Sequence, residues 1–325
     1  MKLQTEVLPS TVTLGQRQTA RSRQTRIQFW CWLFVAPNLT LFLLFTGWPI
    51  AVSWYYSLLD WSGLDSRSAF VGLDNFKALI ADSYFWKAYR NTFVFMLGAV
   101  PLQIGLALAA AVILNHPKLR FAAFFRTVIF LPVVTTASIV GIIMVYIWAS
   151  DGAVNWLLQR LHILNSPINW LGDADWALFT VIIIYVWKNL GINVVYWLAG
   201  LQSVPRELQE AAKVDGAGFF AVFGYITLPL ILPIGLIILL LDIAGALKVF
   251  DLVKTMTDGG PFFATDVVST YIYRYAFSSE LGLPRLGYAS AAGILFAATV
   301  LAIGVIQRLG TGLLRRGGAE RSVKS

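Results

Sequence analysis

The sequence predicts an all-α integral membrane protein with six transmembrane helices and both termini in the cytoplasm. Hydrophobic residues fill 58% of the 325 positions and charged residues only 13%. A soluble domain carries about 25% charged residues, so this chain has too little charge to cover a water-exposed surface. The net charge of +8 would suggest a nucleic-acid partner in a soluble protein. In a membrane protein the same excess marks cytoplasmic loops, so no nucleic-acid partner is expected.

Six stretches of the chain are long and apolar enough to cross a membrane. A helix that crosses about 30 Å of hydrocarbon needs about 20 mostly apolar residues. The apolar runs are continuous, whereas a barrel strand alternates apolar and polar residues over about 10 positions, so helices are favoured. The predicted spans are Phe29–Tyr55, Ala88–Asn115, Phe124–Ala149, Ala177–Leu201, Ile226–Phe250 and Tyr288–Leu309.

The distribution of charge predicts the orientation. Basic residues gather in the N-terminal tail, in the loops after the second and fourth stretches and in the C-terminal tail, while the other loops are richer in Asp. The positive-inside rule places the basic segments in the cytoplasm. We expect a flexible basic tail over residues 1–26, a six-helix membrane domain over residues 27–310 and a cytoplasmic tail over residues 311–325. We favour the interpretation that the basic charges of residues 1–26 only set the topology. The alternative is that this tail also contacts anionic membrane lipid.

The loop over residues 202–227, between the fourth and fifth stretches, has the pattern of two short helices joined at a glycine. Pro205 suits the first turn of a helix, so Arg206–Val214 is predicted to be helical. Gly216 can take the left-handed conformation that ends a helix. Ala217–Tyr225 is predicted to form a second, short amphipathic piece.

Such a helix–glycine–helix elbow suits the docking of a partner. Ala211 and Ala212 have almost no side chain, so a partner's backbone can approach closely, and Glu210 supplies a negative charge at the contact. Pro229 and Pro233 follow at the entry to the fifth stretch, where they kink the helix or fix its start.

The spacing within this loop resembles the signature of permease subunits of binding-protein-dependent ABC importers. That signature is Glu-Ala-Ala, three residues, Gly, nine residues, Ile, one residue and Leu-Pro. The matching positions are Glu210, Ala211, Ala212, Asp215, Gly216, Ala217, Ile226, Leu228 and Pro229. Five further segments resemble the carbohydrate branch of the family, of the maltose and glycerol-3-phosphate type: Val71–Phe76, Asn91–Thr92, Phe250–Val253, Thr257–Pro261 and Gly287–Ala291.

The resemblance implies a permease subunit of the prokaryotic inner membrane that imports a sugar. In this family two homologous permeases pair, two ABC ATPase subunits dock at the signature loop, called the coupling helix, and an extracytoplasmic sugar-binding protein delivers the substrate. The chain contains no Gly-x-x-x-x-Gly-Lys-Ser/Thr sequence, which would hold ATP phosphates. We therefore expect that the chain is not an enzyme and binds no cofactor or metal. ATP and Mg are expected to bind to the partner ATPase subunits.

Polar residues within the predicted spans are candidates for substrate contact. Sugars bind amides, hydroxyls and aromatic faces, and an ionisable residue is costly in a membrane unless it has a role. Asn189, Asn193 and Tyr196 lie at i, i+4 and i+7, on one helix face. The resemblance implies that this part of the fourth span and the middle of the fifth line the sugar cavity. The remaining candidates are Lys188, Gly191, Asp242 and Lys248.

Several alternatives stay open at this point. Lys188 and Asp242 can form an ion pair between helices instead of contacting a ligand, and Lys248 can extend to the membrane surface. A phosphate favours Arg, so an uncharged sugar is preferred over glycerol-3-phosphate, with a polyol as a further alternative. A six-span membrane enzyme or receptor is the third possibility. Two external segments are candidates for contact with a binding protein: Asp173–Trp176 and Asp258–Phe262.

Overall fold

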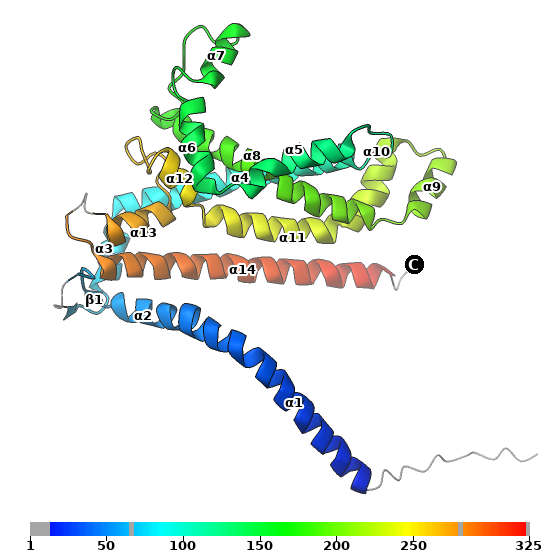
Figure 1. Cartoon of the computed structure of the whole chain (residues 1–325), viewed down its shortest axis with the longest axis horizontal. Coiled ribbons are helices and arrows are strands. Elements are labelled where there is room, and N and C mark those ends of the chain that lie inside the picture. Colours follow the sequence, from blue (N-terminus) through cyan, green and yellow to red (C-terminus); the bar gives the residue numbers. More distant parts are fainter. Residues whose placement is uncertain (1–13, 65–67, 279–281, 323–325) are drawn as a thin grey trace, which may run out of the picture. The chain divides into compact units, whose positions relative to one another are not determined.

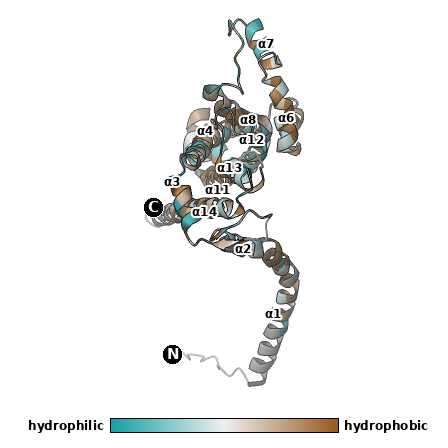
Figure 2. Ribbon diagram, turned by 90° about the vertical axis from the view of Figure 1, so that its left-hand side faces the viewer, coloured by the Kyte–Doolittle hydropathy of each residue, from teal (hydrophilic) through white to brown (hydrophobic). Residues whose placement is uncertain are grey.

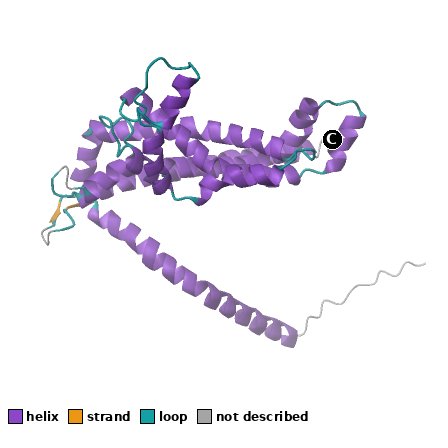
Figure 3. Ribbon diagram, turned by 45° about the horizontal axis from the view of Figure 1, so that its top comes forward, coloured by secondary structure: helices purple, strands orange, loops and turns teal. Residues whose placement is uncertain are grey.

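The computed structural model describes residues 14–64, 68–278 and 282–322 of the chain. Within this part helices predominate, and the strands are one short antiparallel pair, β1 (Leu59–Asp60) and β2 (Ala69–Phe70) (Figure 3). The chain divides into two compact units, Met1–Tyr55 and Tyr56–Ser325.

The first unit is a helix that is longer than the predicted span. Helix α1 (Leu14–Phe42) continues through a π-helical turn η1 (Leu43–Gly47) into α2 (Trp48–Tyr56). Residues 1–26 were predicted to be flexible, but α1 already begins at Leu14; residues 1–13 lie outside the described part of the chain. Gln and Arg are frequent between Leu14 and Arg26, and both residue types favour helix, so the helix extends beyond the span into the tail.

Five of the six predicted spans are confirmed as helices long and apolar enough to cross a membrane. In Figure 2 the hydrophobic colour predominates on the helices of the second unit. The five candidate spans are Arg26–Tyr56, Ser83–Leu114, Ala174–Gln202, Phe219–Leu247 and Leu286–Leu309. They comprise α1 to α2, α4 (Ser83–Leu114), α8 (Ala174–Gln202), α10 to α11 and the first part of α14 (Leu286–Ser322). Because α14 runs to Ser322, the C-terminal tail predicted from residue 311 is helical over most of its length.

The third predicted span, Phe124–Ala149, is wrong as a continuous helix. It consists of α5 (Ala122–Val134) and α6 (Ala137–Ile147), which bend by 101° at the break between them, so the chain has six candidate spans only if this pair counts as one. Thr135 and Thr136 adopt extended conformations at the break. Pro132 removes a helical hydrogen bond just before them, and β-branched residues follow it, which together explain the break.

The fifth span begins earlier and ends earlier than Ile226–Phe250. The predicted separate piece Ala217–Tyr225 is instead α10 (Phe219–Val222) and a π-helical turn η2 (Phe223–Thr227), which run into α11 (Leu228–Leu247). In η2 the amide of Leu228 donates to the carbonyl of Phe223, five residues back, and Pro229 follows directly. The turn η1 has the same arrangement before Pro49. The wider turn relieves the clash between a proline ring and the carbonyl four residues back.

The centre of the second unit is the pair α4 and α8, which make the largest helix–helix contact among the described residues. Apolar side chains of α11 pack along this pair, and Ile231 and Ile238 are fully buried there. A further cluster joins α4 to α14 and is centred on Phe85 and Tyr271. The shorter helices are α3 (Asp74–Ala81), α7 (Ala153–Arg160), α9 (Arg206–Val214), α12 (Asp251–Met256) and α13 (Val268–Phe277).

Candidate functional site

The predicted elbow is present between α9 and α10, and its turn is made by Gly216. Helix α9 has the predicted bounds, Arg206–Val214. The amide of Gly216 donates to the carbonyl of Lys213 at 3.1 Å, and the amide of Ala217 donates to that of Ala212 at 2.9 Å. These two bonds form a Schellman motif, which requires a left-handed residue, and Gly216 has a φ of +86°. Local chemistry therefore determines the direction in which the chain leaves α9.

The elbow exposes large apolar side chains at one end of the second unit (Figure 1). Val214 is 88% exposed, Phe220 86% and Tyr225 84%. Of the signature residues, Glu210, Ala211, Asp215, Gly216 and Pro229 are exposed. The others, Ala212, Ala217, Ile226 and Leu228, are half-buried.

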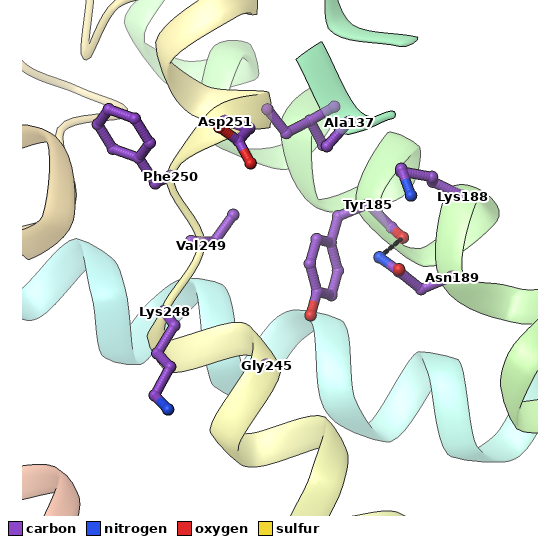
Figure 4. Close-up of a pocket in the computed structure, with 10 residues that line it drawn as sticks. Ala137, Tyr185, Lys188, Asn189, Gly245, Lys248, Val249, Phe250 and Asp251 are labelled. Atoms are coloured by element: carbon purple, nitrogen blue, oxygen red, sulfur yellow. Dashed lines mark hydrogen bonds between the residues drawn. The ribbon is translucent and has the colours of Figure 1, made fainter. Parts of the chain in front are cut away.

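An open cavity of about 160 Å³ lies between α8 and the segment that joins α11 to α12. Figure 4 shows Tyr185, Lys188 and Asn189 on the α8 side and the segment from Gly245 to Asp251 on the other. The cavity is lined by Ala137, Tyr185, Lys188, Asn189, Gly245, Lys248, Val249, Phe250, Asp251 and Leu252.

The cavity carries charges of both signs, an amide and aromatic rings. Lys188 and Lys248 bring positive charge, Asp251 brings negative charge, and Tyr185 and Asn189 bring a phenol and an amide. The amide nitrogen of Asn189 donates to the carbonyl of Tyr185 at 2.9 Å, which orients it within α8. Three of the seven predicted substrate residues, Lys188, Asn189 and Lys248, thus line one cavity.

Asn193 and Asp242 form hydrogen bonds with each other and do not line the cavity. The amide nitrogen of Asn193 donates to both carboxylate oxygens of Asp242, at 2.8 and 2.9 Å, and both residues are buried. The ion pair considered between Lys188 and Asp242 does not occur among the described residues. Asn193 supplies the donor that the buried carboxylate requires, so this pair joins α8 to α11.

Gly191 and Tyr196 also lie away from the cavity. A Cβ atom at Gly191 would lie 2.5 Å from the carbonyl oxygen of Ile129 and 2.8 Å from the Cα of Phe130. The glycine therefore permits close contact between the backbones of α8 and α5. Tyr196 is exposed on α8. The helical spacing of Asn189, Asn193 and Tyr196 is correct, but it does not bring the three side chains into one site.

Sequence reasoning missed the part of the cavity that follows α11. Asp251 belongs to α12, and Val249 and Phe250 lie in the turn before it. The predicted span ran through to Phe250, whereas α11 ends at Leu247 and the chain turns back over the cavity. The segment Phe250–Val253 stood out in the sequence only by its resemblance to the family, and its position in the structure shows that it lines a cavity.

At the end of the second unit opposite the elbow, Asp82 joins three helices. Its carboxylate accepts hydrogen bonds from the amide of Tyr84 at 2.8 Å, the hydroxyl of Tyr271 at 2.6 Å and the hydroxyl of Tyr288 at 3.0 Å. Burial raises the pKa of the Asp82 carboxyl, but these hydrogen bonds together lower it by more, so that pKa lies below its usual value. The ionised carboxylate holds α4, α13 and α14 together.

Long apolar helices surround a polar cavity, and the elbow is exposed at one end of the unit. The chain belongs to the family described as "Binding-protein-dependent transport system inner membrane component", which it matches over residues 103–314. The family resemblance seen in the loop is thereby confirmed, and this family consists of transport components rather than enzymes.

The comparisons include curated relatives and a solved structure. The lactose transport system permease protein LacF of Rhizobium radiobacter is 36% identical over 278 residues, which are 85% of this chain and 92% of that protein. The trehalose/maltose transport system permease protein MalF of Thermococcus litoralis is 34% identical over 290 residues, 88% of this chain and 94% of that protein. A crystal structure of a bacterial ABC transporter for the acidic polysaccharide alginate contains a similar chain, with a TM-score of 0.73 and 25% identity over 91% of this chain and 99% of that one.

Proposed function

We propose that this chain is one of two permease subunits of an ATP-driven importer that takes up a sugar or oligosaccharide. An extracytoplasmic binding protein delivers the substrate, and two separate ABC ATPase subunits supply the energy. Both termini lie in the cytoplasm, as the basic segments require. Membership in a binding-protein-dependent family and relatives with names of sugar permeases support this function.

The observation that carries the proposal is the elbow between α9 and α10. Its turn is built by the hydrogen bonds of Gly216, and its apolar side chains, Val214 and Phe220 among them, are almost fully exposed. A short helix with an exposed apolar face fits a groove in a partner. We assign this groove to the ATPase subunit, so that movement of the ATPases is transmitted through α9 to the spans.

The cavity beside α8 is the proposed site of sugar passage. Asn189, Tyr185 and Lys188 offer hydrogen bonds from the α8 side of the cavity, a combination that suits a polyhydroxylated ring (Figure 4). Lys188 and Lys248 also favour an anionic solute such as glycerol-3-phosphate. The negative charge of Asp251 would repel a phosphate, and no arginine lines the cavity. An uncharged sugar therefore remains the preferred substrate.

Transport follows from alternating access. Closure of the ATPase pair on ATP moves the two elbows together, and the cavity then opens to the outside, where the binding protein releases its sugar. Hydrolysis returns the cavity to the inside. This chain contributes the passage and the docking elbow, while ATP and Mg are bound by the partner ATPases.

The proposal is tested by gentle purification of the chain from its native membrane, followed by mass spectrometry of what accompanies it. We expect a second six-span permease and an ABC ATPase in the same complex, and sugar-dependent ATP hydrolysis once the binding protein is added. Loss of the ATPase from the complex when Phe220 is replaced by Glu, with the permease pair intact, would support the elbow as the contact. A chain that remains alone under several mild detergents would refute the proposal.

A further inference from the structure

The loop between α4 and α5 carries exposed basic side chains and no acidic ones. It covers residues 115–121 and lies at the same end of the second unit as the elbow (Figure 1). Lys118 and Arg120 in the loop and Arg126 in the second turn of α5 are exposed, and none of them forms an ion pair with a described residue. The sequence has no Asp or Glu from residue 83 to residue 150, so no neighbour in the sequence balances this positive charge.

Contacts with the helices hold this loop in one shape. The guanidinium of Arg126 donates to the carbonyl of Leu114 at 2.9 Å, where it also meets the negative end of the α4 dipole. The amide of Leu119 donates to the carbonyl of His116 at 3.1 Å, and the Leu119 side chain packs on the cluster that joins α4, α8 and α11. The loop therefore presents Lys118 and Arg120 on a fixed backbone.

Aromatic side chains follow the basic ones directly. Phe121, the residue before α5, is 77% exposed and has a φ of +60°, in the left-handed region that bulky residues rarely adopt. Such conformations persist only where the surrounding structure enforces them. Phe124 is also exposed, and with Val128 and Leu131 at i+4 and i+7 it forms an exposed apolar stripe along α5. The charged end of the loop thus continues into an apolar helix face.

This order of residues fits the boundary between lipid headgroups and hydrocarbon. We call Lys118, Arg120, Phe121, Phe124 and Arg126 the α4–α5 patch. Lys and Arg clusters immediately beside a span are typical of contact with anionic lipid, because each cation gains from the negative phosphate. Aromatic rings and an apolar stripe next to them contact the acyl chains of the same lipid. A soluble partner would leave the stripe along α5 uncovered, so lipid is the occupant that matches both parts of the surface.

Helix α5 also supports the wall of the cavity. A Cβ at Gly191 of α8 would lie 2.5 Å from the carbonyl oxygen of Ile129 in α5, so the two backbones are in close contact there. Asn189, which lines the cavity, is two residues from Gly191 on the same helix. A lipid that holds the first turns of α5 therefore acts on a helix that packs directly behind the cavity.

We propose that the α4–α5 patch is a binding site for one anionic phospholipid of the cytoplasmic leaflet. Lys118 and Arg120 bind the phosphate, together with the donors of Arg126 that the Leu114 carbonyl leaves unused. Phe121 and Phe124 contact the acyl chains. The inference rests on the proposed function for its orientation, since that function puts this end of the spans in the cytoplasm.

The test titrates the complete importer in detergent with dioleoylphosphatidylglycerol or dioleoylphosphatidylcholine and counts bound lipid by native mass spectrometry. We expect tighter binding of the phosphatidylglycerol, and a dissociation constant about 30-fold higher when Lys118→Gln and Arg120→Gln are combined. The matched control combines Lys77→Gln and Arg160→Gln, which removes two exposed charges outside the patch and should leave the constant unchanged. Equal constants for the patch variant and the unsubstituted importer would overturn the proposal.

Two further measurements separate lipid from other occupants. Phe121→Asn, which tolerates a positive φ, should weaken the binding of both lipids to a similar extent, because the ring contacts acyl chains and not the headgroup. An excess of inorganic phosphate should not displace the phosphatidylglycerol, and displacement would assign the patch to free phosphate instead. A preference for phosphatidylglycerol that occurs in the permease pair and is lost when the ATPase subunits are added would assign the patch to the ATPase, and the proposal would be wrong.

A labelling measurement checks the orientation independently. Cys31 is the one cysteine of the sequence, so a Cys31→Ser, Lys118→Cys chain has one thiol. We expect a membrane-impermeant maleimide to label it in inside-out vesicles and not in right-side-out vesicles. Labelling in right-side-out vesicles would refute both the orientation in the proposed function and the lipid site. Labelling only in inside-out vesicles, without a preference for phosphatidylglycerol, would refute the α4–α5 patch alone.

Discussion

Replacing Gly216 by Val changes only the backbone preference at the turn of the elbow. A Cβ at this position would meet nothing within 4 Å, so the substitution causes no clash with neighbouring atoms. The φ of +86° is nevertheless unfavourable for any residue with a Cβ, and most of all for a β-branched one. The cost is about 1–3 kcal/mol. Since about 1.4 kcal/mol is a factor of ten, the docking conformation of the elbow becomes about 10- to 100-fold less populated.

Gly218 offers a matched control two residues further along the same loop. A Cβ there would also meet nothing within 4 Å, but Gly218 has a φ of −72° and a ψ of 170°, which Val adopts readily. Gly218→Val should therefore leave docking unchanged. Gly216→Asn should lie between Gly216→Val and the unsubstituted chain, because Asn tolerates the left-handed region better than Val.

The assay is the apparent affinity of the ATPase subunit for the permease pair in nanodiscs, together with sugar uptake in proteoliposomes. We expect the dissociation constant for Gly216→Val to rise about 10- to 100-fold while the expression level stays normal. Normal uptake by Gly216→Val would refute the assignment of the elbow to docking. An equal loss in both Gly216→Val and Gly218→Val would show that the φ at Gly216 is not the cause.

Three further outcomes follow from the remaining contacts. Gly191→Ala should lower the thermal stability of the detergent-solubilised chain, because its Cβ would press on the backbone of α5; a loss of uptake at unchanged stability would instead assign Gly191 to the substrate. Asn193→Leu should destabilise by about 1–3 kcal/mol by leaving the Asp242 carboxylate without its donor, and Asp242→Leu in the same chain should restore part of this loss in thermal melting. The lowered pKa of Asp82 stabilises the fold above the usual aspartate pKa of about 3.9, and this contribution is lost as the pH falls through the lowered value. Tyr271→Phe should therefore reduce the drop in melting temperature between about pH 6 and pH 3, and an unchanged drop would contradict the role of that hydrogen bond.

The elbow and most of the spans could be predicted because their causes are local. Apolar composition over 20 or more residues is enough to identify a span, and five of the six were found, although the fifth begins at Phe219 rather than Ile226. The end of α9 depends on Gly216 and on hydrogen bonds between residues only a few positions apart. Such features can be identified from spacing alone, without knowledge of how the helices pack.

The cavity and the partners of the buried polar residues depend on contacts between distant segments. Helical spacing correctly placed Asn189 and Asn193 on one face, yet Asn189 lines the cavity while Asn193 binds Asp242 of α11. Asp251 reaches the cavity because α11 ends at Leu247 and the chain turns back. Periodicity shows which side of a helix a residue occupies, but a neighbouring helix that is distant in the chain, as Asp242 is 49 residues from Asn193, decides whether that residue packs, pairs or meets a ligand.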